Sequence, residues 1–77
     1  MSVMAAMKFL ERVEREETLR TQLYISRADD LERLVKFAHG KGFILTEDEL
    51  REALKNYKPK LPTANIEPLK QLAAKNN

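Results

Sequence analysis

The sequence contains no cysteine, and this absence excludes a disulfide framework, a thiolate metal site and a cysteine nucleophile. A domain without such cross-links depends on its hydrophobic core. At 77 residues, the chain has room for one domain and none for a two-lobed catalytic cleft. So small a core usually leaves only about 3 to 5 kcal/mol of stability. We therefore expect a marginally stable domain that a partner would help to stabilise.

Long apolar runs are also missing. The N-terminal sequence MSVMAAMKFLERVEREE reaches Lys8 and then a series of charges after a few apolar residues. This opening is too short for a signal peptide or a membrane span, so we expect a cytoplasmic protein without membrane contact. Hydrophobic residues make up 43% of the chain and charged residues 34%, a balance that is typical of a soluble helical domain.

The apolar residues that are present recur at intervals of three and four, which predicts an all-α bundle of short helices. The first helix is expected over residues 3–15. Acidic side chains follow it and favour a second short helix. The inward side of this second helix should carry Leu19 and Leu23, with Tyr24 and Ile25 as further candidates.

The third helix is expected between a serine and a glycine. Ser26, with Asp29 three residues later, is a variant of the capping box that begins many helices. Leucine, valine and alanine then form a stripe, and Gly40 should end the helix. Gly40 and Gly42 are the only glycines, and they bracket Lys41 where the chain must turn.

Thr46 and Glu49 have the spacing of a complete capping box, which predicts a fourth helix over residues 47–56. The inward side chains of the four helices should form one core. We expect this core to contain Phe9, Leu10, Leu19, Leu23, Leu34, Phe43, Leu50 and Leu54. Truncating a buried phenylalanine typically costs about 3 to 5 kcal/mol, so Phe43→Ala is expected to leave little folded protein.

Two prolines, Pro59 and Pro62, divide the chain into a helical domain over residues 1–57 and a tail over residues 58–77. The tail holds four lysines and one glutamate, a net charge of +3, which leaves −1 for the rest of a chain with net charge +2. The composition therefore changes at the same place as the predicted structure.

The tail can form a short fifth helix, with Asn65 as its cap and Pro68 in its first turn. Ile66, Leu69 and Leu72 would share one side of it, and this stripe is either docked on the bundle or ordered by a partner. Burying three aliphatic side chains gains about 5 kcal/mol, and ordering about ten residues costs at least as much. We expect a loosely held helix, with Ile66, Leu69 and Leu72 as candidate partner-binding residues.

No catalytic constellation is visible in the sequence. The single histidine, His39, falls in the last turn of the third helix, where a structural role is favoured over metal binding or catalysis. Ser2 and Ser26 stand where helices are expected to begin, and the carboxylates of Glu16 and Glu17 fall in a first helical turn. We expect no enzyme activity, no metal, no cofactor and no small-molecule substrate.

The third and fourth predicted helices invite comparison with a DNA-reading helix-turn-helix, which would make the chain a nucleic-acid-binding regulator. The second helix of that motif lies beside phosphates, yet residues 47–56 carry four acidic and two basic side chains. The connection GKGFIL is also longer than the usual turn. Nucleic-acid binding is therefore the weaker alternative to a protein-binding module.

The segments FLERVEREETLRTQL, AHGKGF and TEDEL, in this order, resemble the Nif-eleven family of small bacterial domains. The family takes its name from nitrogen-fixation gene clusters, and related sequences are leader regions of ribosomally made peptide natural products. The resemblance covers about residues 1–57. It implies a non-catalytic helical module recognised by a partner protein, either a peptide-modifying enzyme or a nitrogen-fixation protein.

Leader-type members continue into a small-residue cleavage motif and a core rich in Cys, Ser or Thr, as in a bacteriocin propeptide. This sequence has no Gly-Gly site and no cysteine, and the hydroxyl side chains beyond Thr46 are those of Tyr57 and Thr63. A precursor needs side chains that can be cyclised or dehydrated. We therefore expect either a stand-alone domain or a leader that lacks its core, and the departure favours the stand-alone domain.

Overall fold

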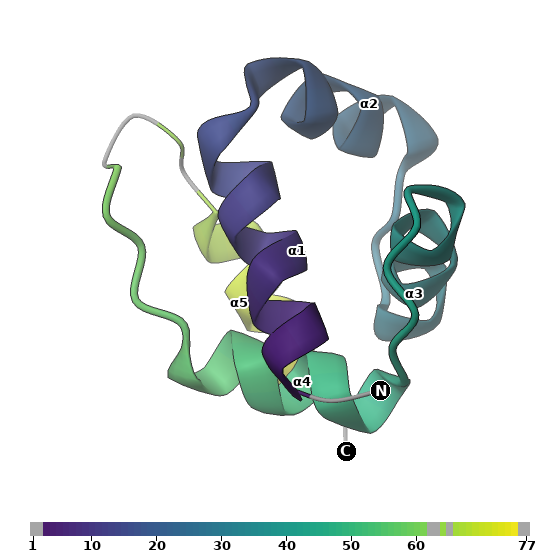
Figure 1. The fold of residues 1–77 in the computed structure, drawn as a ribbon, viewed down its shortest axis with the longest axis vertical. Coiled ribbons are helices and arrows are strands. Elements are labelled where there is room, and N and C mark those ends of the chain that lie inside the picture. Colours follow the sequence, from purple (N-terminus) through teal and green to yellow (C-terminus); the bar gives the residue numbers. More distant parts are fainter. Residues whose placement is uncertain (1–2, 62–63, 65, 76–77) are drawn as a thin grey trace.

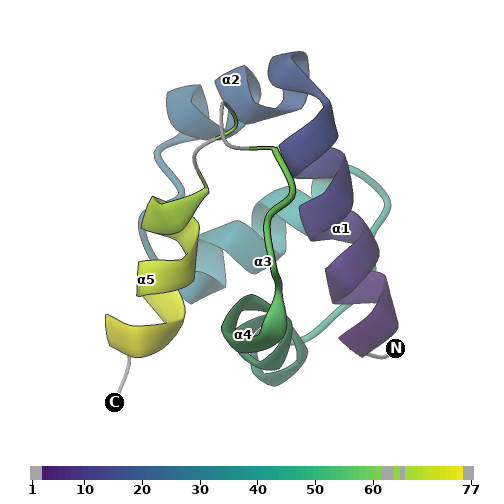
Figure 2. The same ribbon diagram turned by 90° about the vertical axis from the view of Figure 1, so that its left-hand side faces the viewer.

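The computed structural model describes residues 3–61, 64 and 66–75, and within them the chain forms five helices and no strand. The predicted all-α fold is confirmed. The helices are α1 (Val3–Arg15), α2 (Glu17–Ser26), α3 (Leu31–Gly40), α4 (Glu47–Asn56) and α5 (Glu67–Lys75). In Figure 1, α2 lies across one end of α1 and α4 across the other. Figure 2 separates α1 from α5 and shows both between α2 and α4, with α3 behind them.

Local capping signals place α4 where the sequence predicts it. Thr46 Oγ1 accepts a hydrogen bond from the Glu49 amide at 3.1 Å, and Glu49 Oε1 accepts one from the Thr46 amide at 3.0 Å. This reciprocal pair satisfies two donors that the first turn of a helix leaves open. The predicted bounds of α1 and α4 and the predicted end of α3 at Gly40 are confirmed.

The predicted start of the third helix is wrong. Ser26 is the last residue of α2, and its hydroxyl donates to the Leu23 carbonyl at 2.8 Å. Asp30 caps α3 instead, because its carboxylate accepts from the Arg33 amide at 2.8 Å and the next residue begins the buried stripe. Ser2 and Asn65, the other predicted caps, lie outside the described residues.

Seven of the eight predicted core residues are buried: Phe9, Leu10, Leu19, Leu23, Leu34, Leu50 and Leu54. Phe43 is the exception, since it is only partly buried at the edge of the core. Its ring packs against Phe9 with centroids 5.4 Å apart, and the Arg12 guanidinium lies 5.8 Å from the Phe43 ring centre. Tyr24 and Ile25 were expected to extend the inward side of α2, but they are 66% and 75% exposed.

The fifth helix is docked on the bundle. It packs against α4, its residues Leu72 and Ala73 are buried, and Ile66 just before it is only 2% exposed. Pro68 occupies the first turn of α5, as expected. How rigidly α5 is held stays a prediction, which amide exchange can test.

Candidate functional site

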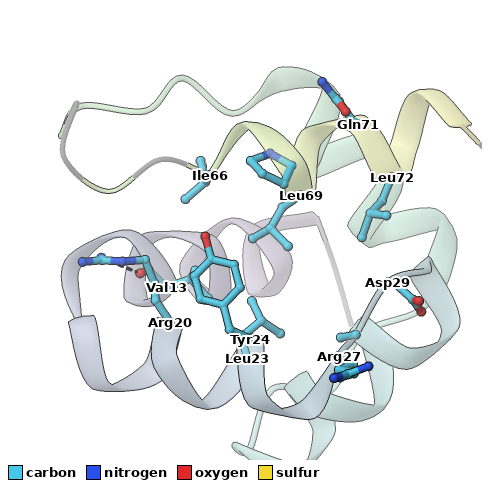
Figure 3. A pocket seen from close by; sticks show the side chains of 12 residues that line it. Val13, Arg20, Leu23, Tyr24, Arg27, Asp29, Ile66, Leu69, Gln71 and Leu72 are labelled. Carbon is cyan, nitrogen blue, oxygen red and sulfur yellow. Dashed lines mark hydrogen bonds between the residues drawn. The ribbon is translucent and has the colours of Figure 1, made fainter.

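A pocket of about 620 Å³ opens between α2 and α5, with α1 contributing to its floor (Figure 3). Its volume lies within the range of about 300 to 1,000 Å³ that is usual for ligand pockets. Apolar side chains supply most of the lining: Val13, Leu23, Tyr24, Ala28, Ile66, Pro68, Leu69 and Leu72. The polar lining residues are Arg20, Arg27, Asp29 and Gln71. We call this site the α2–α5 pocket.

The three candidate partner-binding residues all line the α2–α5 pocket. Ile66 and Leu72 are buried and Leu69 is partly buried, so together they form one wall of the pocket and are not a freely exposed stripe. In Figure 3 the Leu69 side chain points across the pocket toward Leu23 and Tyr24 of α2. Sequence reasoning found the α5 wall from its helical spacing but missed the α2 wall.

Arginines stand toward both ends of the pocket, and they differ in what they bind (Figure 3). The Arg20 Nη1 atom donates to the Val13 carbonyl at 3.0 Å and also to the Glu14 carbonyl. Arg20 therefore caps the C-terminal end of α1, where the carbonyls lack helical partners. Arg27 lies toward the other end and forms no ion pair with any described residue.

A buried carboxylate determines the path of the chain that leads to α5. Glu14 is 4% exposed and is the one buried charged residue in the described part of the chain. It accepts hydrogen bonds from the Tyr57 hydroxyl, from the Lys60 amide at 2.5 Å and from the Leu61 amide at 2.6 Å. Three donors from the segment after α4 therefore converge on a single side chain of α1.

Two opposing effects act on the Glu14 carboxyl. Burial raises its pKa, but the hydrogen bonds from Tyr57, Leu61 and Lys60 outweigh burial and hold the pKa of Glu14 below its ordinary value of 4.5. Burial, together with the hydrogen bond to Glu14, raises the pKa of the Tyr57 hydroxyl. At neutral pH the pair is therefore a charged acceptor and a protonated donor, which is the arrangement that the hydrogen bond requires.

The Glu14 cluster is linked to α5 by a second contact. The Lys70 Nζ atom donates to the Tyr57 carbonyl at 2.8 Å, so one residue at the end of α4 is bound by both α1 and α5. These bonds position the α5 wall of the pocket. Sequence reasoning missed Glu14, although its spacing from Leu10 places it on the inward side of α1.

His39 connects two backbone segments. Its Nε2 atom lies 2.8 Å from the Leu45 carbonyl oxygen, which joins the end of α3 to the loop that leads into α4. This contact gives His39 a structural role. Over residues 3–61, 64 and 66–75, no group of three or more His, Asp or Glu side chains is arranged to hold a metal ion. No helix in the same part of the chain is long and apolar enough to cross a membrane.

A family model described as the Nif11 domain matches residues 1–50 of the chain. The chain belongs to the Nif11 family. The match spans α1 to α3 and the first turn of α4, so α5 lies beyond it. Comparison with curated proteins and with solved structures found no match. In this Nif11 chain, the α2–α5 pocket therefore combines one wall from the matched region with another from outside it.

Proposed function

We propose that this Nif11 domain is a non-catalytic binding module and that a partner protein recognises it at the α2–α5 pocket. The Nif11 domain is a small domain that is linked to peptide leader regions and is not a known enzyme family. The observation that carries the proposal is the pocket itself, because it brings Ile66, Leu69 and Leu72 together with apolar side chains of α2.

The family suggests two kinds of partner. One is a peptide-modifying enzyme, which would use the domain as a helical handle, and the other is a nitrogen-fixation protein. We place either complex in the cytoplasm. The helix-turn-helix alternative gains no support from α4, whose first turn carries Glu47, Asp48 and Glu49, since these acidic side chains would repel DNA phosphates.

The test uses two matched truncations of exposed apolar side chains. Tyr24 lines the pocket and is 66% exposed, whereas Ile44 lies outside the pocket and is 65% exposed. The full chain is immobilised, proteins of the native host are captured, and one purified candidate partner is then titrated against the parent protein, Tyr24→Ala and Ile44→Ala. We expect Tyr24→Ala to weaken binding about tenfold and Ile44→Ala to leave it unchanged.

Two results would contradict the proposal. Equal binding by the parent protein and Tyr24→Ala would place the interface elsewhere on the domain. Submicromolar binding to duplex DNA that weakens steeply as salt rises would favour the nucleic-acid alternative, because phosphate contacts release counterions.

A further inference from the structure

Arg27 ends α2 in an unusual backbone conformation. Its φ and ψ are 55° and 49°, in the left-handed region, and its amide donates to the Tyr24 carbonyl at 3.2 Å. Among the described residues it is the one non-glycine position with positive φ. Glycine is the usual residue at such a helix end, because any Cβ is crowded there. The chain thus has a long cationic side chain at a position where the backbone conformation favours glycine.

The charge of Arg27 is not compensated within the described residues. Asp29 is the acidic residue of the pocket lining. Its Oδ1 atom lies 3.5 Å from Arg33 Nη1, and it forms no ion pair with Arg27. Figure 3 shows Arg27 and Asp29 toward the same end of the pocket, on the side opposite Leu72. Arg33 forms ion pairs with both Asp29 and Asp30, so Arg27 is the arginine at this end that has no ion-pair partner among the described residues.

Tyr24 places apolar surface at the rim of the pocket. The Tyr24 side chain lines the pocket and is 66% exposed. An occupant that covers this exposed side chain extends past the pocket itself. Tyrosine and arginine are also among the residue types enriched at the hot spots of protein interfaces.

We propose that the α2–α5 pocket binds an amphipathic helical segment of the partner and that Arg27 binds a carboxylate on that segment. This inference rests on the proposed function and adds the chemistry of the partner. Apolar side chains spaced three and four apart on the segment enter the pocket beside Leu69, and an Asp or Glu at one end of that stripe meets the guanidinium.

The experiment uses a displayed library of peptides of about four helical turns, with a constant apolar stripe and randomised flanking positions. The library is selected on the full chain. We expect the selected peptides to carry Asp or Glu at one position in register with the stripe. Replacing that residue by Gln, or using the Arg27→Gly protein, should weaken binding about tenfold.

Arg27→Gly has the advantage that it removes the steric strain of a side chain in the left-handed backbone conformation. We expect it to melt at a higher temperature than the parent protein while binding less tightly, which a misfolded variant would not do. Lys36→Gln is the matched control, because it removes one positive charge outside the pocket lining and should leave peptide binding unchanged. Amide chemical shifts of Leu23, Leu69 and Leu72 should move on addition of the acidic peptide.

Other outcomes would overturn the inference in distinguishable ways. Equal affinity for the acidic and Gln peptides would remove the role of Arg27 and leave the pocket as a binding site. Three other results would exclude a helical segment as the occupant. The library could yield no peptide, the protein could bind dodecanoate but no peptide, or the chain could dimerise with rising concentration and shift the pocket amides. The proposed function is tested separately by Tyr24→Ala on the captured partner.

Discussion

The two sides of α5 are packed differently. Toward α4 the helix is packed against the bundle, and the segment before it is bound to Glu14. Toward α2 it leaves a pocket of about 620 Å³. The closed side contributes to stability because apolar surface and hydrogen-bond donors are both satisfied there. The open side leaves apolar surface for a ligand, so one helix serves the fold on one side and a binding site on the other.

The largest effect is expected where packing is complete. Phe9 is fully buried among the core side chains, so Phe9→Ala should cost about 3 to 5 kcal/mol and leave little folded protein. Phe43→Ala, at the edge of the core, should cost about 1 to 2 kcal/mol. Urea denaturation followed by circular dichroism measures both. Equal losses would show that Phe43 contributes as much as a fully buried ring.

The next effect concerns the bound segment before α5. Glu14→Gln keeps the size of the side chain but removes its charge, so the bonds from the Lys60 and Leu61 amides lose their charged acceptor and Tyr57 can keep its bond only by accepting from the new amide. We expect a loss of about 2 kcal/mol in the free energy of unfolding. Glu11→Gln, on the exposed side of α1, is the control and should have little effect. Similar losses in both variants would remove the special role of Glu14.

The same carboxylate should make stability depend on pH. Because the pKa of Glu14 is lower in the folded chain than its ordinary value of 4.5, its contribution is present above that value. The contribution is lost as the pH falls through the lower pKa of the folded state. Melting temperatures measured from neutral to acidic pH should therefore fall further for the parent protein than for Glu14→Gln. Parallel curves would contradict the assignment.

A smaller difference is expected between the amide exchange rates of helices within the native state. Since only one side of α5 is fully packed, its amides should exchange faster than those of α3 and α4. Hydrogen exchange followed by NMR can compare Leu69 and Leu72 with Leu34 and Leu50. Equal protection of the two pairs would show that α5 opens only when the whole domain unfolds, and the open side would then cost the helix no stability.

The smallest effect is expected at the pocket rim. Tyr24→Ala removes a side chain that is mostly exposed, so the free energy of unfolding should change by less than about 0.5 kcal/mol. Leu72→Ala, on the buried wall, should cost about 2 kcal/mol. Denaturation of the two variants in parallel compares their free energies of unfolding. It therefore shows which of the two side chains supports the fold. A large loss for Tyr24→Ala would show that the rim also supports the fold.

The sequence by itself determined the elements whose signals are local. The capping box of Thr46 and Glu49 acts within one helical turn, and the end of α3 at Gly40 follows from a single residue. The same local signals misplaced the start of α3, because Ser26 and Asp30 are both competent caps and only one of them precedes a residue that enters the core. Seven core residues followed from spacing alone, since helix periodicity places them on one side.

The tertiary structure alone decided which surfaces meet. Glu14 binds donors 43 to 47 residues away, and no local pattern encodes that pairing. The exposure of Tyr24 and the position of Arg27 depend on the angle at which α2 lies across α1, which the packing of the whole bundle sets. The α2–α5 pocket exists because α5 returns to the bundle from beyond the Nif11 match, so its two walls are joined by long-range packing that helical spacing does not specify.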